Sequence, residues 1–401
     1  MKKIVALLLS LVLVASMCSF AMADDTVTLR FWMWDDAQEP AIQAMCDLYT
    51  ESHPNVKFEI SCSPAVDGLN SKIQATIGTA DAPEIFFINY NLAAEYIPLG
   101  IVADLTDYNI DQSELASGIV GSYTVDGRVY AVAKDTDSFA VFYNKALFDA
   151  AGVAYPSDDW TIDDFCATAL SLSNGDVIGY TNSTSDRVFY NFIWSNGGAI
   201  YSEDGLSCAV NSPEAIEVLQ KLLDLQNAGG MYNAQQLTDF GGAFVSGIAA
   251  MTIDGSWMLS QYAEALGDNL GIVELPSGAA GKVSANHGIG YATTTTNAHM
   301  DETVDFLKFL ATYEAQVLQC NVVIPANLKA SDDWAANYPN VNTGAFVNAL
   351  GYGSGYLANV NATLARSAYQ SELANFRAGI YEDAASFAAA CEVTVNDALE
   401  D

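Results

Sequence analysis

Three short segments of the chain place tryptophan next to aspartate or to small polar residues. The first is Phe31–Asp36, which contains Trp34 and Asp35; the second is Trp194–Asn196, and the third is Asp254–Trp257. An indole ring offers a flat apolar face, and a carboxylate accepts hydrogen bonds from hydroxyl groups. Because a sugar has an apolar C–H face and a rim of hydroxyls, these segments predict a site that binds carbohydrate.

The sequence lacks the signatures of catalysis and of cofactor binding. It contains no phosphate-binding glycine loop, no dinucleotide fingerprint and no nucleophile elbow, and its histidines have no metal-ligand spacing. The acidic pairs Asp35/Asp36 and Asp135/Asp137 would suit a glycosidase, which uses two carboxylates. With 49 acidic residues in the chain, such pairs arise by chance. We therefore predict a protein that is not an enzyme and that needs no cofactor and no metal.

The first 23 residues have the pattern of a secretory signal. Two lysines precede an apolar run over 4–14, and Ala21–Ala23 matches the pattern for cleavage before Asp24. A membrane anchor is one alternative, against which the small-residue cleavage site argues. A lipoprotein attached through Cys18 is another, against which the bulky methionine before this cysteine argues. We predict a free exported protein, in the periplasm or at the outer cell surface.

The charge of the chain restricts its partners. The formal charge of the full sequence is −34, and removal of the two lysines in the signal brings it to −36. Such a surface repels nucleic acid and anionic lipid. The five arginines are scattered along the sequence, which argues against an anionic ligand. Six cysteines remain after cleavage without a C-x-x-C pair, and both disulfides and buried thiols fit this pattern.

The elements that position the tryptophan segments alternate between strand and helix. Strands are predicted over 27–34, 56–61 and 84–88. The first helix between them is expected to open with a capping box at Asp36 and Glu39 and to end at His53, and the second covers 69–77. The third strand is apolar throughout, as expected for a buried strand of a parallel sheet. This opening pattern and the length of 401 residues predict an α/β protein of two domains.

Several segments follow one another in a characteristic order and spacing along the chain. They are Phe31–Asp36, Pro83–Phe87, Gly100–Leu105, Lys134–Asp137 with Phe142–Phe148, Trp194–Gly198, Ala250–Trp257 and Gly288–Gly290. With them, the whole mature chain resembles the extracellular solute-binding proteins of ABC importers, in the large sugar-binding group that includes maltose-binding protein. The resemblance implies two α/β lobes joined by hinge crossings, with a ligand cleft between them. The implied division is a signal peptide over 1–23, an N-terminal lobe over 24–135 plus 286–330, and a C-terminal lobe over 136–285 plus 331–401.

The resemblance also assigns residues of the N-terminal lobe to the cleft. Trp34 and Asp35, at the end of the first strand, would lie on the wall of this lobe. Asn89 and Tyr90, after the third strand, would face the cleft. Asp137 would lie where the chain first crosses between the lobes.

The remaining implied contacts come from the C-terminal lobe and from the return crossing. Trp194 and Trp257 would be stacking platforms, and Asp254 would accept hydrogen bonds from sugar hydroxyls. His287 and Gly288 would lie near the return crossing.

Structural roles for several of these residues stay open. Trp32 and Trp34 share one face of a strand, so either can belong to the core, and Trp32 is an alternative platform. Asp254 also suits a helix N-cap, and Asp137 also suits an ion pair with Lys134. Trp194 and His287 can instead be buried structural side chains. Tyr352 and Tyr356 can be further cleft residues.

Residues and resemblance together predict a receptor that captures a mono- or oligosaccharide between two lobes and delivers it to the membrane permease of an ABC transporter. We expect a monomer with no nucleic-acid partner. The alternatives are a secreted glycosidase and a receptor for a non-sugar solute such as a polyol or a peptide. A purely structural surface protein is a third alternative, for which no solute would close the lobes.

Overall fold

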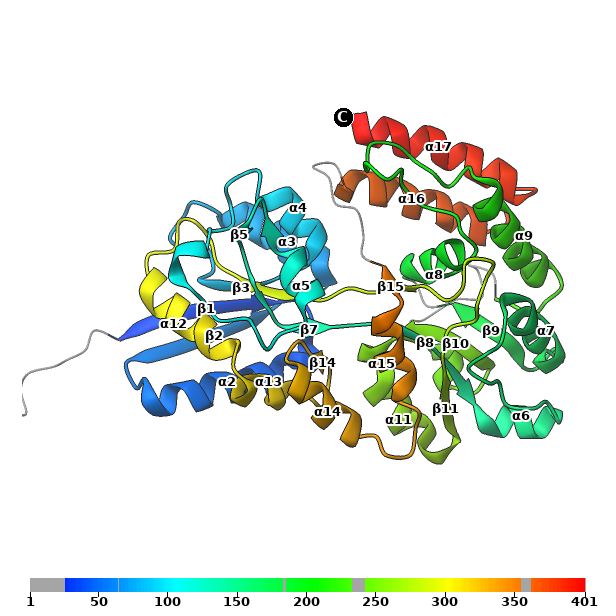
Figure 1. The fold of residues 1–401 in the computed structure, drawn as a ribbon, viewed down its shortest axis with the longest axis horizontal. Helices are drawn as coiled ribbons and strands as arrows, with labels where there is room; N and C mark the ends of the chain where they lie inside the picture. Colours follow the sequence, from blue (N-terminus) through cyan, green and yellow to red (C-terminus); the bar gives the residue numbers. More distant parts are fainter. Residues whose placement is uncertain (1–25, 64, 183–184, 233–241, 355–361, 401) are drawn as a thin grey trace, which may run out of the picture.

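The computed structural model describes residues 26–63, 65–182, 185–232, 242–354 and 362–400. The predicted signal over 1–23, its alternative anchor Cys18 and the alternative cleft residue Tyr356 lie outside these residues. None of the helices in the described part of the chain is both long enough and apolar enough to span a membrane. The chain forms two lobes, each around its own β-sheet, at the left and right of Figure 1. We call the lobe around the five-stranded sheet the first lobe and the lobe around the four-stranded sheet the second.

The sheet of the first lobe has the strand order β2-β1-β3-β13-β6. Its strands are β1 (Val27–Met33), β2 (Val56–Cys62), β3 (Ile85–Ile88), β6 (Val132–Ala133) and β13 (Gly290–Ala292). β1 runs parallel to β2 and β3, whereas β13 runs antiparallel to β3 and β6. The three strands predicted from the sequence are therefore confirmed, and a late segment of the chain returns to complete their sheet.

Helices and short elements cover this first sheet. They are η1 (Asp36–Gln38), α2 (Glu39–Ser52), α3 (Ala65–Thr76), α4 (Tyr90–Tyr96), η2 (Thr106–Tyr108), α5 (Ser117–Ser122), β4 (Thr124–Val125), β5 (Arg128–Val129), α12 (Met300–Leu310), α13 (Tyr313–Gln316) and η5 (Val317–Gln319). Apolar residues of β1, β3 and β13 form its core with α2 and α12. Asp36 does not open α2, since Asp35 caps a turn of 3-10 helix and α2 begins at Glu39.

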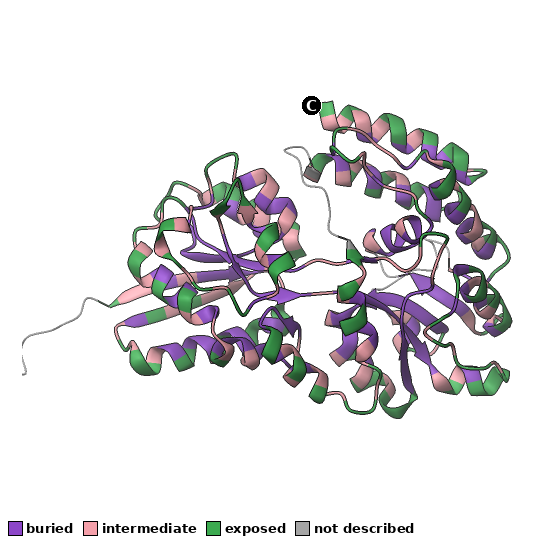
Figure 2. Cartoon of the chain, viewed as in Figure 1, coloured by how far each residue is buried: buried purple, intermediate pink, exposed green. Residues whose placement is uncertain are grey.

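The second lobe is built on the strand order β11-β8-β10-β9. Its strands are β8 (Phe139–Asn144), β9 (Ile178–Asn182), β10 (Ala249–Gly255) and β11 (Leu270–Val273). Every residue of β8 and β10 is buried, and both strands are purple along their length in Figure 2. β10 is antiparallel to β8 and parallel to β9, so the carboxyl ends of β10 and β9 lie at the same edge of the sheet.

Helices pack on both faces of this second sheet. They are α6 (Lys145–Ala151), α7 (Ile162–Leu172), α8 (Arg187–Ser195), α9 (Pro213–Asn227), α10 (Gly242–Val245), η3 (Ser256–Met258), α11 (Leu259–Leu266), η4 (Gly267–Asn269), α15 (Gly344–Gly351), α16 (Ala362–Arg377) and α17 (Ala384–Glu400). One apolar cluster joins the sheet to α7, α8, α9, α16 and α17, and another joins it to α11 and α15.

The chain crosses between the lobes through short extended segments. They contain β7 (Asp135–Thr136), β12 (Ser284–Ala285) and β14 (Ile324–Pro325), which is followed by α14 (Leu328–Ala336). β15 (Gly353–Ser354) lies beside β12 and comes between α15 and α16 of the second lobe. β7 pairs with β14, β12 pairs with β15, and an isolated bridge joins Asp137 to His287. Figure 1 shows β7 running between the lobes. These crossings hold polar residues from distant parts of the sequence side by side at the junction.

Candidate functional site

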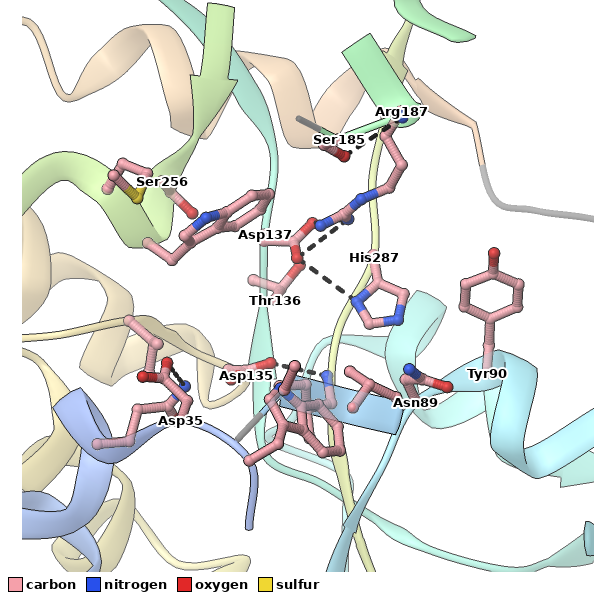
Figure 3. A pocket seen from close by; sticks show the side chains of 18 of the residues that line it. Asp35, Asn89, Tyr90, Asp135, Thr136, Asp137, Ser185, Arg187, Ser256 and His287 are labelled. Carbon is pink, nitrogen blue, oxygen red and sulfur yellow. Dashed lines mark hydrogen bonds and ion pairs between the residues drawn. The ribbon is translucent and has the colours of Figure 1, made fainter. Parts of the chain in front are cut away.

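A pocket of about 530 Å³ lies at the junction of the two lobes. Its lining residues come from the ends of β1 and β3, from the crossings, and from α8, η3 and α16. Seven of the predicted cleft residues line it: Trp34, Asp35, Asn89, Tyr90, Asp137, Trp257 and His287. In Figure 3, Asp137 and His287 of the crossings lie between Arg187 and Ser256 of the second lobe and Asp35 and Asn89 of the first.

The wall of the first lobe begins with Trp34 and Asp35. The Trp34 ring is half-buried and packs edge to face on Phe87, with ring centroids 5.4 Å apart. Asp35 accepts hydrogen bonds at Oδ1 from the backbone N–H of Ala37, at 3.1 Å, and at Oδ2 from Nε2 of Gln38, at 2.7 Å. Asp35 therefore caps the turn that follows β1, and its carboxylate is fixed in direction before any ligand arrives.

Asn89 and Tyr90 follow β3 and start α4. Oδ1 of Asn89 accepts a hydrogen bond from the backbone N–H of Leu92 at 2.9 Å and so caps the helix. The Tyr90 ring lies 5.2 Å from the ring of His287 and extends into the pocket in Figure 3. Burial raises the pKa of Tyr90, so its hydroxyl stays protonated at neutral pH.

An ionic cluster of Asp137, Arg187 and His287 lies in the pocket. Nη1 of Arg187 lies 3.1 Å from Oδ1 and 3.3 Å from Oδ2 of Asp137, and Nδ1 of His287 lies 3.4 Å from Oδ2. The three side chains are between 11% and 14% exposed. In Figure 3 the guanidinium and the imidazole both point at the Asp137 carboxylate.

The titration of this cluster follows from burial and from its charges. Burial by itself raises the pKa of Asp137, but the Arg187 guanidinium and the hydrogen bond from His287 outweigh it and lower the pKa below its usual value. Burial lowers the pKa of His287, and the hydrogen bond to Asp137 only partly opposes this. At neutral pH the cluster therefore holds one cation, one anion and a neutral imidazole.

Lys134 is not the partner of Asp137. Its Nζ lies 2.7 Å from Oδ2 of Asp135, and both side chains are buried. Oδ1 of Asp135 accepts a hydrogen bond from the backbone N–H of Ile289 at 2.7 Å.

The wall of the second lobe presents Trp257 in the turn after β10. The guanidinium carbon of Arg187 lies 4.7 Å from its ring centroid, and the ring of Phe139 meets it edge to face at 5.4 Å. A Cβ at position 255 would lie 1.9 Å from the indole, so only the glycine of the Asp254–Trp257 segment lets the ring fold back on the chain.

Three predicted cleft residues do not line this pocket. Trp194 lies in α8, where it packs against Tyr190 and the core of the second lobe. Asp254 is fully buried. Its carboxylate already accepts hydrogen bonds from the Tyr262 hydroxyl and from the backbone N–H of Gly255, each at 2.9 Å. The predicted role of Asp254 toward sugar hydroxyls therefore does not fit the geometry.

Gly288 has a backbone role. A Cβ at this position would lie 2.4 Å from the carbonyl oxygen of Asp135, and its own carbonyl accepts a hydrogen bond from the Tyr123 hydroxyl at 2.7 Å. Trp32, the alternative platform, is 5% exposed and lies beneath Nζ of Lys72 at 3.8 Å, outside the pocket.

Two arginines that were not predicted from the sequence line the pocket. Arg187 belongs to the cluster described above, and Arg366 on α16 forms two hydrogen bonds, at 2.9 and 2.7 Å, with the buried carboxylate of Asp186. Arg187 and Arg366 are thus far apart in the sequence but share one pocket. A useful signal would have been the adjacent Asp186 and Arg187 at the start of α8, whose partners lie far along the chain.

The described residues contain no group of three or more histidine, cysteine, aspartate or glutamate side chains that could hold a metal ion. The pocket therefore offers chemistry of three kinds, namely aromatic faces, paired charges and hydrogen-bonding groups. These suit noncovalent recognition of a polar organic molecule.

Comparisons with known proteins show the family of this chain. A family model described as bacterial extracellular solute-binding protein matches residues 44–343. A putative binding protein of Brucella abortus is 22% identical over 329 residues, which are 78% of this chain and 78% of that protein. A lactose-binding protein of Rhizobium radiobacter is 25% identical over 377 residues, which are 84% of this chain and 88% of that protein.

A solved structure shares the fold. An ABC substrate-binding protein from Listeria monocytogenes, in complex with cycloalternan, superposes with a TM-score of 0.87 at 23% sequence identity. The match covers 94% of this chain and 100% of that protein. The predicted two-lobe binding-protein fold is confirmed.

Proposed function

This chain belongs to the bacterial extracellular solute-binding proteins, and from that membership we propose that it captures a mono- or oligosaccharide in the junction pocket and delivers it to the permease of an ABC importer. An exported location follows from the family, as the sequence predicted. The observation that carries the proposal is the pairing of Trp34 from the first lobe with Trp257 from the second in one pocket rich in polar side chains.

The position of the two tryptophans suggests how capture occurs. A ligand that contacts Trp34 and Trp257 together contacts both lobes, and so it favours the arrangement in which the lobes are close. The crossings that contain β7 and β12 are short, and few backbone dihedral changes there would move one lobe relative to the other. The permease then recognises the closed, loaded form.

The size of the pocket, the chemistry of its lining and the ligands of similar proteins support a carbohydrate ligand. A pocket of about 530 Å³ is in the usual range for small-molecule sites. The Rhizobium relative is named for lactose, and the Listeria protein was solved with cycloalternan. Both are carbohydrates, and the aromatic and polar lining of the pocket suits their C–H faces and hydroxyls.

We propose binding without turnover. Of the acidic pair Asp135/Asp137, the first is occupied by Lys134 and by a backbone N–H, and the second by Arg187 and His287. Neither carboxylate can protonate a glycosidic oxygen or act as a base without breaking these contacts. We also propose that the protein acts as a monomer, because one chain supplies both walls of the pocket.

A calorimetric and thermal-shift screen of the mature protein tests the proposal. The panel contains glucose, galactose, lactose, maltose, maltotriose and cycloalternan, with sorbitol and a tripeptide as non-sugar solutes. We expect a saturable rise in melting temperature with at least one sugar, because a ligand that binds only the native state stabilises it. A response to the tripeptide or to sorbitol alone would overturn the sugar assignment, and chromatographic detection of cleaved oligosaccharide would overturn the receptor assignment.

A further inference from the structure

We infer that the Asp137–Arg187 ion pair is the specificity determinant that restricts the pocket to uncharged sugars and rejects sugar acids. This inference rests on the proposed carbohydrate function and narrows its ligand class. It depends on three observations, which concern the free donors of Arg187, the charge balance of the pocket and the location of Asp137.

Arg187 is held so that part of its guanidinium stays available. Nη1 contacts both carboxylate oxygens of Asp137. The rings of Trp257 and Phe139 also hold the guanidinium, whose carbon lies 4.7 Å from the first ring centroid and 5.0 Å from the second. Among the described residues, Nε and Nη2 of Arg187 have no acceptor within hydrogen-bond distance. These two nitrogens form the planar fork of N–H donors that recognises paired oxygens.

Such a fork by itself would attract a carboxylate as well as a diol. Asp137 removes the attraction, because its negative charge lies within 3.3 Å of the same guanidinium. A vicinal diol can accept from Arg187 and donate to a carboxylate, so it satisfies both partners. A ligand carboxylate at the fork would instead lie close to a second carboxylate that it cannot hydrogen-bond, and like charges at such separation repel.

The other charges of the pocket do not compensate for this repulsion. Arg366 is neutralised by Asp186, and Asp135 by Lys134. Burial lowers the pKa of His287, so it adds no positive charge at neutral pH. Asp35 and Asp36, which also line the pocket, add negative charge. The pocket therefore contains no unpaired cation among the described residues that line it.

The test compares matched neutral and acidic sugars on the mature protein by calorimetry at pH 7. The probes are glucose with glucuronate and galactose with galacturonate, together with glucuronamide and galacturonamide. Each amide has the shape of its acid without the charge. In the wild type we expect each acid to bind more than about tenfold more weakly than its neutral partner, since like-charge contacts cost several kcal/mol. We expect the amides to bind within about threefold of the neutral sugar.

Asp137→Asn keeps the size of the side chain and its oxygen acceptor, but it leaves Arg187 as an unpaired cation. We expect the ratio of neutral to acidic affinity to fall by at least about tenfold in this variant, mainly because the acids gain affinity. Asp67→Asn is the matched control, because it removes the same charge from an exposed position of α3 that does not line the pocket. We expect its ratio to equal that of the wild type.

The outcomes separate the two proposals. If no neutral sugar, acid or amide binds the wild type, the carbohydrate function fails and this inference fails with it. If sugars bind but the acids bind as well as their neutral partners, or if the ratio is unchanged in Asp137→Asn, only this inference is overturned. Should Asp137→Asn not fold, the amides still decide, because amides rejected as strongly as acids would mean that size and not charge excludes the acids.

Discussion

The guanidinium carbon of Arg187 lies 4.7 Å from the ring centroid of Trp257, so a cation covers the indole that the sequence predicted as a sugar platform. This contact joins α8 to the turn after β10 and holds both side chains in one place. Cation–π contacts of this kind contribute about 0.5–2 kcal/mol, depending on exposure. The indole is therefore positioned before ligand arrives, and a sugar must share it with Arg187.

Trp257→Ala is expected to weaken sugar binding by about 1–3 kcal/mol, because it removes the aromatic contact of the second lobe. Trp257→Phe should lose less, since a smaller aromatic face remains. Calorimetry with the best sugar of the screen measures the affinity, and guanidinium denaturation verifies that the free energy of unfolding is nearly unchanged. Equal affinity in the wild type and in the alanine variant would remove Trp257 from the site.

Asp254 is expected to make stability depend on pH between about 4 and 7. Burial raises the pKa of its carboxyl from the ordinary 3.8 to about 7, although the N–H of Gly255 and the hydroxyl of Tyr262 oppose this. Between these two values the native state binds more protons than the unfolded state, so the free energy of unfolding falls as pH rises, by up to about 4 kcal/mol.

Asp254→Asn removes the titrating group and should flatten that dependence. Urea unfolding of both proteins at several pH values between 4.5 and 7.5 measures the difference. We expect the variant to gain stability relative to the wild type as pH rises. Parallel curves would show that Asp254 has a similar pKa in the native and unfolded states.

The ion pair of Asp186 and Arg366 is expected to stabilise the docking of α16 on the second lobe. The Asp186 side chain is 1% exposed, so removing Arg366 leaves a buried charge without its main partner. Arg366→Met should lower the free energy of unfolding by about 3 kcal/mol, and the double variant with Asp186→Asn should lose less than the sum of the single changes. Additive losses in denaturant unfolding would argue against a direct coupling.

The cysteines are expected to be unreactive thiols in the native protein. Cys46, Cys62, Cys166, Cys208, Cys320 and Cys391 are all free. Burial raises the pKa of Cys166 and of Cys208 to about 11 and that of Cys320 to about 12, which leaves little thiolate at pH 8. Titration with a disulfide reagent should therefore be slow in buffer and should count all six thiols in denaturant. A lower count in denaturant would reveal a disulfide formed after export.

The sequence by itself determined the local elements and much of the wall of the first lobe. The strands that end before Trp34 and Asn89 were predictable because their apolar runs and the turn residues after them are local signals. Both strands are parallel neighbours of one sheet, so the residues that follow them meet at the same edge. The family resemblance added the crossings near Asp137 and His287, and their roles as ligand contacts stay predictions.

Tertiary structure decided which polar side chains face the pocket and which face the core. Asp137 and Asp254 are both aspartates at strand ends, yet one meets Arg187 in the pocket and the other is enclosed with Tyr262. The sequence also could not show that Arg187 and Arg366 would share a pocket, because α8 and α16 come together only when the second lobe forms its core. Side-chain direction and long-range packing are not local properties, so the charge balance of this site is decided only in the folded chain.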